Sequence, residues 1–103
     1  MQTIGVGENM PKKYRSNPPR LAKRAMKTFE DRAISLGDFR PMFEEIAYRW
    51  SIVLGRPITP AQAARCMAEM KMARWNAGYK EDHAIDAANY AFIAAAMDVE
   101  KDK

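Results

Sequence analysis

The chain has 103 residues and a formal net charge of +4, with 48% apolar and 29% charged residues. A chain of this length builds one hydrophobic core, so we expect a single domain whose stability would be modest without a partner subunit. No stretch approaches the run of about 20 apolar residues that spans a bilayer, which argues against a membrane protein.

Cysteine content and the first residues bear on the cellular compartment. The start of the sequence lacks the apolar run of a signal peptide, and Cys66 is the only cysteine. One cysteine forms neither an internal disulfide nor a thiolate metal cluster, so a reducing, cytoplasmic setting is expected. Lone thiols within Ala/Met-rich helices are usually buried, and Cys66 is therefore expected in the core.

The positive charge is concentrated near the N-terminus. Residues 1–40 hold nine Lys/Arg against four Asp/Glu, whereas residues 41–103 hold eight against nine. One run of cations contains no acid and could contact nucleic acid phosphates. It consists of Lys12, Lys13, Arg15, Arg20, Lys23, Arg24 and Lys27. A solvated surface explains the same charges, since no known DNA-reading motif accompanies them.

Proline, glycine and capping residues mark the expected ends of helices, and their positions predict an arm followed by four helices. Residues 1–16 lack apolar periodicity and predict a flexible basic arm before a helical domain at 17–103. Thr59-Pro60, with Gln62 three residues after the threonine, is the sharpest helix start, because it matches a capping box. The helices are expected at about 18–35, 39–54, 60–77 and 81–98.

These elements predict an all-α, compact four-helix bundle, since the connections are short and no segment shows the alternation of a strand. The last helix is apolar without a break from Ala91 to Met97. One small bundle does not easily cover that surface, so we expect a homo-oligomer. A helix buried at the centre of a single chain is the alternative.

The segment that joins the last two helices, KMARWNAGYKEDHAID, carries unusually placed charges. Lys71 and Arg74 lie off the polar edge of their helix, and Asp82 and Asp86 lie on a stripe that later turns apolar. Gly78 reverses the chain, which brings the cations within reach of the carboxylates. A buried ion-pair network that fixes helix docking and a ligand site explain this pattern equally well.

The sequence from Arg32 to Ala96 resembles a family of small, largely uncharacterised helical proteins of phages and prophages. That family is itself similar to the MazG-like all-α nucleotide pyrophosphohydrolases. The resemblance rests on MFEEIAYRWSIVLG, ITPAQAARCMAEMKMAR and DHAIDAANYA. It implies an oligomeric all-α bundle with a nucleotide site between helices.

The resemblance and its gaps favour a phage-derived nucleotide-binding protein that sequesters a nucleotide or a host immune signal. Its ligand residues would be Lys71, Arg74, Asp82, Asp86 and Tyr90. In this hypothesis the two cations meet phosphates and the tyrosine stacks on a base. No catalytic residue is assigned, and binding is favoured over catalysis.

The enzyme alternative is a Mg²⁺-dependent nucleotide pyrophosphohydrolase with Glu44, Glu45, Asp82 and Asp86 as metal ligands. Tyr48 stands where the hydrolases have the third glutamate of an E-E-x-x-E stretch, which weakens this alternative. A second alternative is a phage accessory factor that binds DNA or protein through Lys12 to Lys27, or an inhibitor of a host enzyme.

Overall fold

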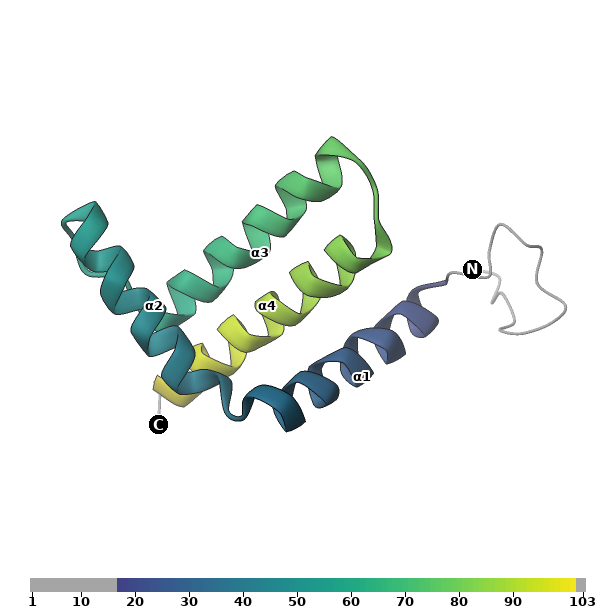
Figure 1. The fold of residues 1–103 in the computed structure, drawn as a ribbon, viewed down its shortest axis with the longest axis horizontal. Helices are drawn as coiled ribbons and strands as arrows, with labels where there is room; N and C mark the ends of the chain where they lie inside the picture. Colours follow the sequence, from purple (N-terminus) through teal and green to yellow (C-terminus); the bar gives the residue numbers. More distant parts are fainter. Residues whose placement is uncertain (1–16, 102–103) are drawn as a thin grey trace, which may run out of the picture.

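The computed structural model describes residues 17–101, which fold into four α-helices with no strand among them (Figure 1). They are α1 (Pro18–Leu36), α2 (Phe39–Leu54), α3 (Pro60–Ala77) and α4 (Glu81–Lys101). The predicted compact, all-helical fold with four helices is confirmed, and α4 continues beyond the expected end near 98. The predicted flexible arm, residues 1–16, lies outside the described residues.

Side-chain caps and glycines explain where the helices begin and end. The Asn17 side chain accepts a hydrogen bond from the Arg20 backbone N–H at 3.1 Å. Thr59 and Gln62 form the capping box: each side chain accepts from the other's backbone N–H, at 3.1 and 2.9 Å. Gly55 ends α2 at φ 68°, a left-handed conformation that glycine adopts without steric cost.

Helix α4 lies at the centre of the molecule. It packs against α3 on one side and α1 on the other, while much of α2 projects away from them (Figure 1). Ala63 and Ala64 of α3 are fully buried, and Ala94 of α4 is almost so. Because alanine side chains are small, α3 and α4 can approach closely over most of their length.

The hydrophobic core is shared by α2, α3 and α4. Its buried members are Phe43, Ala47, Ala61, Ala63, Ala64, Ile93, Ala94 and Met97. Helix α1 adds buried Ala25 and partly buried Phe29. At the far end of α4, Arg40 Nε lies 2.8 and 2.9 Å from the two carboxylate oxygens of Glu100, which ties the start of α2 to α4.

Several large apolar side chains remain exposed, among them Ile34, Val53 and Phe92. The apolar run of α4 is divided: Ile93 and Met97 are buried within the chain, and Phe92 faces outward. Cys66 is also exposed, so its predicted burial is wrong. No described helix combines the length and apolar composition needed to cross a membrane.

The close approach of α3 and α4 leads to a stability prediction. Ala63 is completely buried, so Ala63→Leu adds volume to a packed interior. This substitution should lower the free energy of unfolding by about 1–3 kcal/mol. Ala73→Leu, at an exposed position of the same helix, is the control and should change it by less than about 0.5 kcal/mol. Urea unfolding followed by circular dichroism measures both. Equal effects would show that the α3–α4 contact is not tightly packed.

Candidate ligand-binding site

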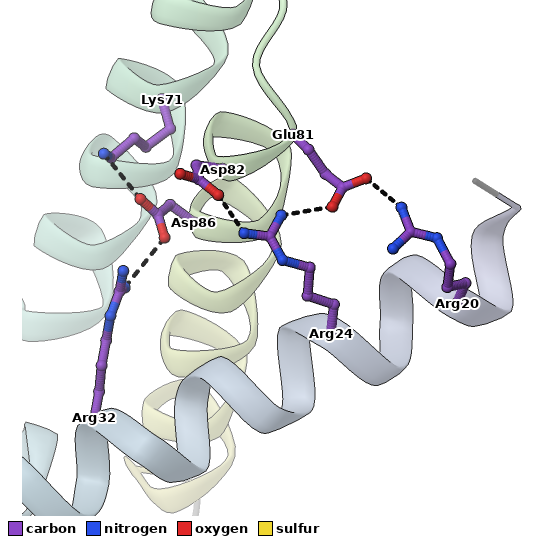
Figure 2. A network of polar contacts seen from close by, with 7 residues as sticks. All are labelled: Arg20, Arg24, Arg32, Lys71, Glu81, Asp82 and Asp86. Carbon is purple, nitrogen blue, oxygen red and sulfur yellow. Dashed lines mark hydrogen bonds and ion pairs between the residues drawn. The ribbon is translucent and has the colours of Figure 1, made fainter. Parts of the chain in front are cut away.

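Three arginines of α1 reach carboxylates of α4 (Figure 2). At the outer end of this network, Glu81 accepts from Arg20 and, at 2.6 Å, from Nη1 of Arg24. The Nη2 of Arg24 pairs with Asp82, whose side chain is largely exposed. The first turn of α4 is therefore held against the first turns of α1 by charge-assisted hydrogen bonds.

Asp86 occupies the inner end of the network and is 8% exposed. One of its carboxylate oxygens lies 3.1 Å from Nη1 of Arg32 on α1, and the other lies 3.0 Å from Nζ of Lys71 on α3. The Lys71 side chain is 17% exposed and the Arg32 side chain 51%. A single buried carboxylate thus connects both neighbours of α4 and offsets the desolvation of Lys71.

Asn89 continues this contact one turn further along α4. It is 6% exposed, and its Nδ2 donates to the backbone carbonyl of Ala25 at 3.0 Å. A buried amide left without a partner would be destabilising, so this bond fixes the distance between α1 and α4.

The ion pairs also shift side-chain pKa values. Hydrogen bonding from Arg24 lowers the pKa of Asp82, and the guanidinium charge lowers it further. The pKa of Asp38 is lowered chiefly by a hydrogen bond from the Arg40 backbone N–H at the start of α2. Both carboxylates are therefore more acidic in the folded chain than in the unfolded chain.

A pocket of about 290 Å³ lies beside Asp86, between α1, the start of α2 and α4. Four aromatic rings line it: Phe29, Phe39, Phe43 and Tyr90. Two edge-to-face pairs fix these rings, Phe29 with Phe39 at 6.0 Å and Phe43 with Tyr90 at 6.1 Å between centroids. The polar lining comes from Arg32, Asp38, Asp86 and Asn89.

The structure brings together only part of the predicted ligand set. Lys71 and Asp86 form an ion pair, and Tyr90 lies in the pocket wall. Arg74 is exposed and makes no ion pair within residues 17–101, so it does not form the ion pair with the α4 carboxylates that was one of its two predicted roles. Asp82 pairs with Arg24 of α1, and the pocket lies on that side of α4, not between α3 and α4.

The four carboxylates proposed as metal ligands are not gathered at one point. Glu45 pairs with Arg49 of its own helix at 2.8 Å, and Glu44 lines a different pocket, near Glu100. Asp82 and Asp86 belong to the α1–α4 network. Within residues 17–101 no three His, Cys, Asp or Glu side chains are arranged to hold a metal ion.

The predicted nucleic acid run is also divided by the fold. Arg20 and Arg24 pair with α4, and Lys27 pairs with Asp31 at 3.3 Å. Lys23 is exposed, whereas Lys12, Lys13 and Arg15 lie outside the described residues. Sequence reasoning missed α1 as the partner of the α4 carboxylates. The signal was the spacing of four or eight residues that places Arg20, Arg24 and Arg32 along one side of α1.

Together, these features define a small all-α domain with an arginine–carboxylate network beside an aromatic pocket. The chain belongs to the family described as Domain of unknown function (DUF6378), whose family model matches residues 20–98. This confirms the expectation of an uncharacterised family. Neither a curated protein nor a solved structure matches the chain.

Removal of the Asp86 charge should destabilise the fold. Asp86→Ala leaves Lys71 with little solvent and no counter-charge, and breaking a buried pair in this way costs about 3–5 kcal/mol. Adding Lys71→Met should recover much of the loss, because it removes the unpaired charge. Chemical denaturation of the two single variants and the double variant measures the coupling. Additive effects would contradict an energetic link between the two side chains.

The lowered pKa of Asp82 predicts a dependence of stability on pH. The Arg24 pair is fully stabilising above the unfolded carboxyl pKa of about 3.9, and is lost as the pH falls through the lower folded value. Arg24→Gln should therefore lose less stability than the unaltered chain below about pH 4. Thermal unfolding of both proteins at low salt, between about pH 3 and pH 7, measures this difference. Parallel curves for the two proteins would refute the role of the pair.

Proposed function

We propose that this chain is a nucleotide-binding protein and that its ligand lies in the pocket between α1, α2 and α4. The observation that carries the proposal is the combination of four aromatic rings with Arg32 and Asp86 in one pocket of about 290 Å³. Aromatic rings suit a nucleobase, and a guanidinium suits a phosphate, which it can contact bidentately. The volume is at the lower end of small-molecule sites, which suits a base and sugar with the phosphates outside.

The Asp86 network makes the guanidinium of Arg32 available to a phosphate at a low cost in free energy. Arg32 is half exposed at the pocket, and Lys71 contacts the other oxygen of Asp86. When Arg32 turns to a phosphate, Asp86 keeps Lys71 as its counter-charge and is not left as a bare buried anion. The oxygen that Arg32 releases then accepts a hydrogen bond from a ribose hydroxyl. Tyr90 contacts the base from the pocket wall.

The sequence resemblance supports the finer part of the proposal. In this proposal the protein is of phage origin and related to MazG-like hydrolases, and it sequesters a nucleotide or a host immune nucleotide signal in the bacterial cytoplasm. Exposed Ile34 and Phe92 support a homo-oligomer in which a second copy covers part of the apolar surface.

Binding is favoured over cleavage by the position of the carboxylates. A metal-dependent pyrophosphohydrolase needs several oxygen ligands around one point, with room for phosphates and a nucleophilic water. Glu45 of α2 pairs with Arg49 and Glu44 lines a different pocket, whereas Asp82 and Asp86 of α4 pair with residues of α1 and α3. The pocket residues therefore support retention of an intact nucleotide.

Calorimetry with nucleosides, nucleoside phosphates and cyclic or ADP-ribose-derived nucleotides tests this function. Arg32→Ala should weaken nucleotide binding about tenfold or more, because a hydrogen bond to a charged group contributes about 1.5–3 kcal/mol. The same substitution should leave nucleoside binding nearly unchanged.

Arg49→Ala is the matched control, since Arg49 is an exposed arginine that pairs with Glu45 on α2. It should bind every ligand as the unaltered chain does. Absence of binding at high micromolar concentrations of all nucleotides, with the helical circular dichroism spectrum intact, would reject the proposal.

A further inference from the structure

The turn between α3 and α4 carries two exposed aromatic side chains that the pocket does not use. Trp75 is 39% exposed and Tyr79 58% exposed. Their rings meet edge to face, with centroids 5.6 Å apart and an interplanar angle of 62°. Neither ring belongs to the hydrophobic core cluster. Each ring retains surface on which another flat group could stack.

A cation stands next to each ring in the sequence. Arg74 precedes Trp75 and Lys80 follows Tyr79 in the sequence, and both cations are exposed. Neither forms a salt bridge within residues 17–101, whereas the next two carboxylates along the chain are occupied by α1. Those pairs are Arg20 with Glu81, and Arg24 with Glu81 and Asp82. The ion pairs of α1 thus leave the charges of Arg74 and Lys80 uncompensated.

The described residues leave space beside Gly78, in the turn that joins the two rings. Gly78 has an extended φ of 178°, and a Cβ added there would meet no atom of residues 17–101 within 4 Å. In Figure 1 this turn lies at one end of the molecule, far along α4 from the projecting part of α2.

We propose that Trp75, Tyr79, Arg74 and Lys80 form a surface that binds single-stranded nucleic acid. Every base has a flat face that can stack on an aromatic ring, and phosphates on either side of it meet the two cations. Duplexes hide those faces within the base stack, so single strands are bound in preference. None of these four residues lines the nucleotide pocket, and none belongs to the predicted basic run between Lys12 and Lys27.

Fluorescence anisotropy with labelled oligothymidylate and oligouridylate of about 12 nucleotides tests the surface. Both strands should bind, and their relative affinities show whether DNA or RNA is preferred. With two phosphate contacts, the plot of log affinity against log salt should have a slope of about −1.4. A duplex of the same length should bind more weakly.

Substitutions of the rings separate stacking from general attraction by positive charge. Trp75→Ala and Tyr79→Ala should each weaken oligonucleotide binding about tenfold. Tyr48→Ala is the matched control, because Tyr48 is an exposed aromatic residue on α2, away from the turn. This substitution should leave oligonucleotide binding unchanged. Oligonucleotide should also quench tryptophan fluorescence in Trp50→Phe, which retains Trp75, and not in Trp75→Phe.

Three outcomes would overturn the proposal. One is absence of binding to either strand at about 100 μM, a concentration at which even weak nonspecific binding is detected. Another is binding that Trp75→Ala leaves unchanged, and the third is stronger binding of duplex. If the two rings bind a protein partner instead, neither oligonucleotide should bind.

Discussion

Asp86 is the group on which the arrangement of α1, α3 and α4 depends. It is nearly buried, yet it contacts a cation on each neighbouring helix, Lys71 on α3 and Arg32 on α1. A buried charge needs such partners, because desolvation without them costs several kcal/mol. The requirement fixes the rotation of α4 about its axis, and that rotation turns Asn89 towards α1 and Tyr90 into the aromatic pocket.

The attachment of α1 differs from that of α3. Helix α3 contacts α4 through buried alanines, whereas α1 contributes Ala25 and part of Phe29 to apolar packing. The arginine pairs and the hydrogen bond from Asn89 also join α1 to α4. Exposed ion pairs contribute about 0–1 kcal/mol each and weaken with salt, so the docking of α1 is more sensitive to ionic strength than the α3–α4 contact.

Local signals in the sequence predicted the four helices well, because caps, prolines and glycines act within a few residues. The pairing of Lys71 with Asp86 was also predictable, since one short turn separates their helices. The partners of Asp82 and Glu81 were not, because Arg24 lies 58 residues from Asp82. Helical periodicity shows which face is polar, but not which distant helix covers it. The pocket was missed for the same reason, since α1 supplies part of its wall.

The docking of α1 also determines the charge at the α3–α4 turn. With α1 in place, Arg20 and Arg24 offset Glu81 and Asp82, and Arg74 with Lys80 leaves an excess of positive charge. Without α1, the same two carboxylates would offset these two cations, and the attraction for phosphates would largely vanish. The carboxylates at the start of α4 are therefore compatible with the proposed nucleic acid surface on the adjoining turn only because arginines from another helix neutralise them.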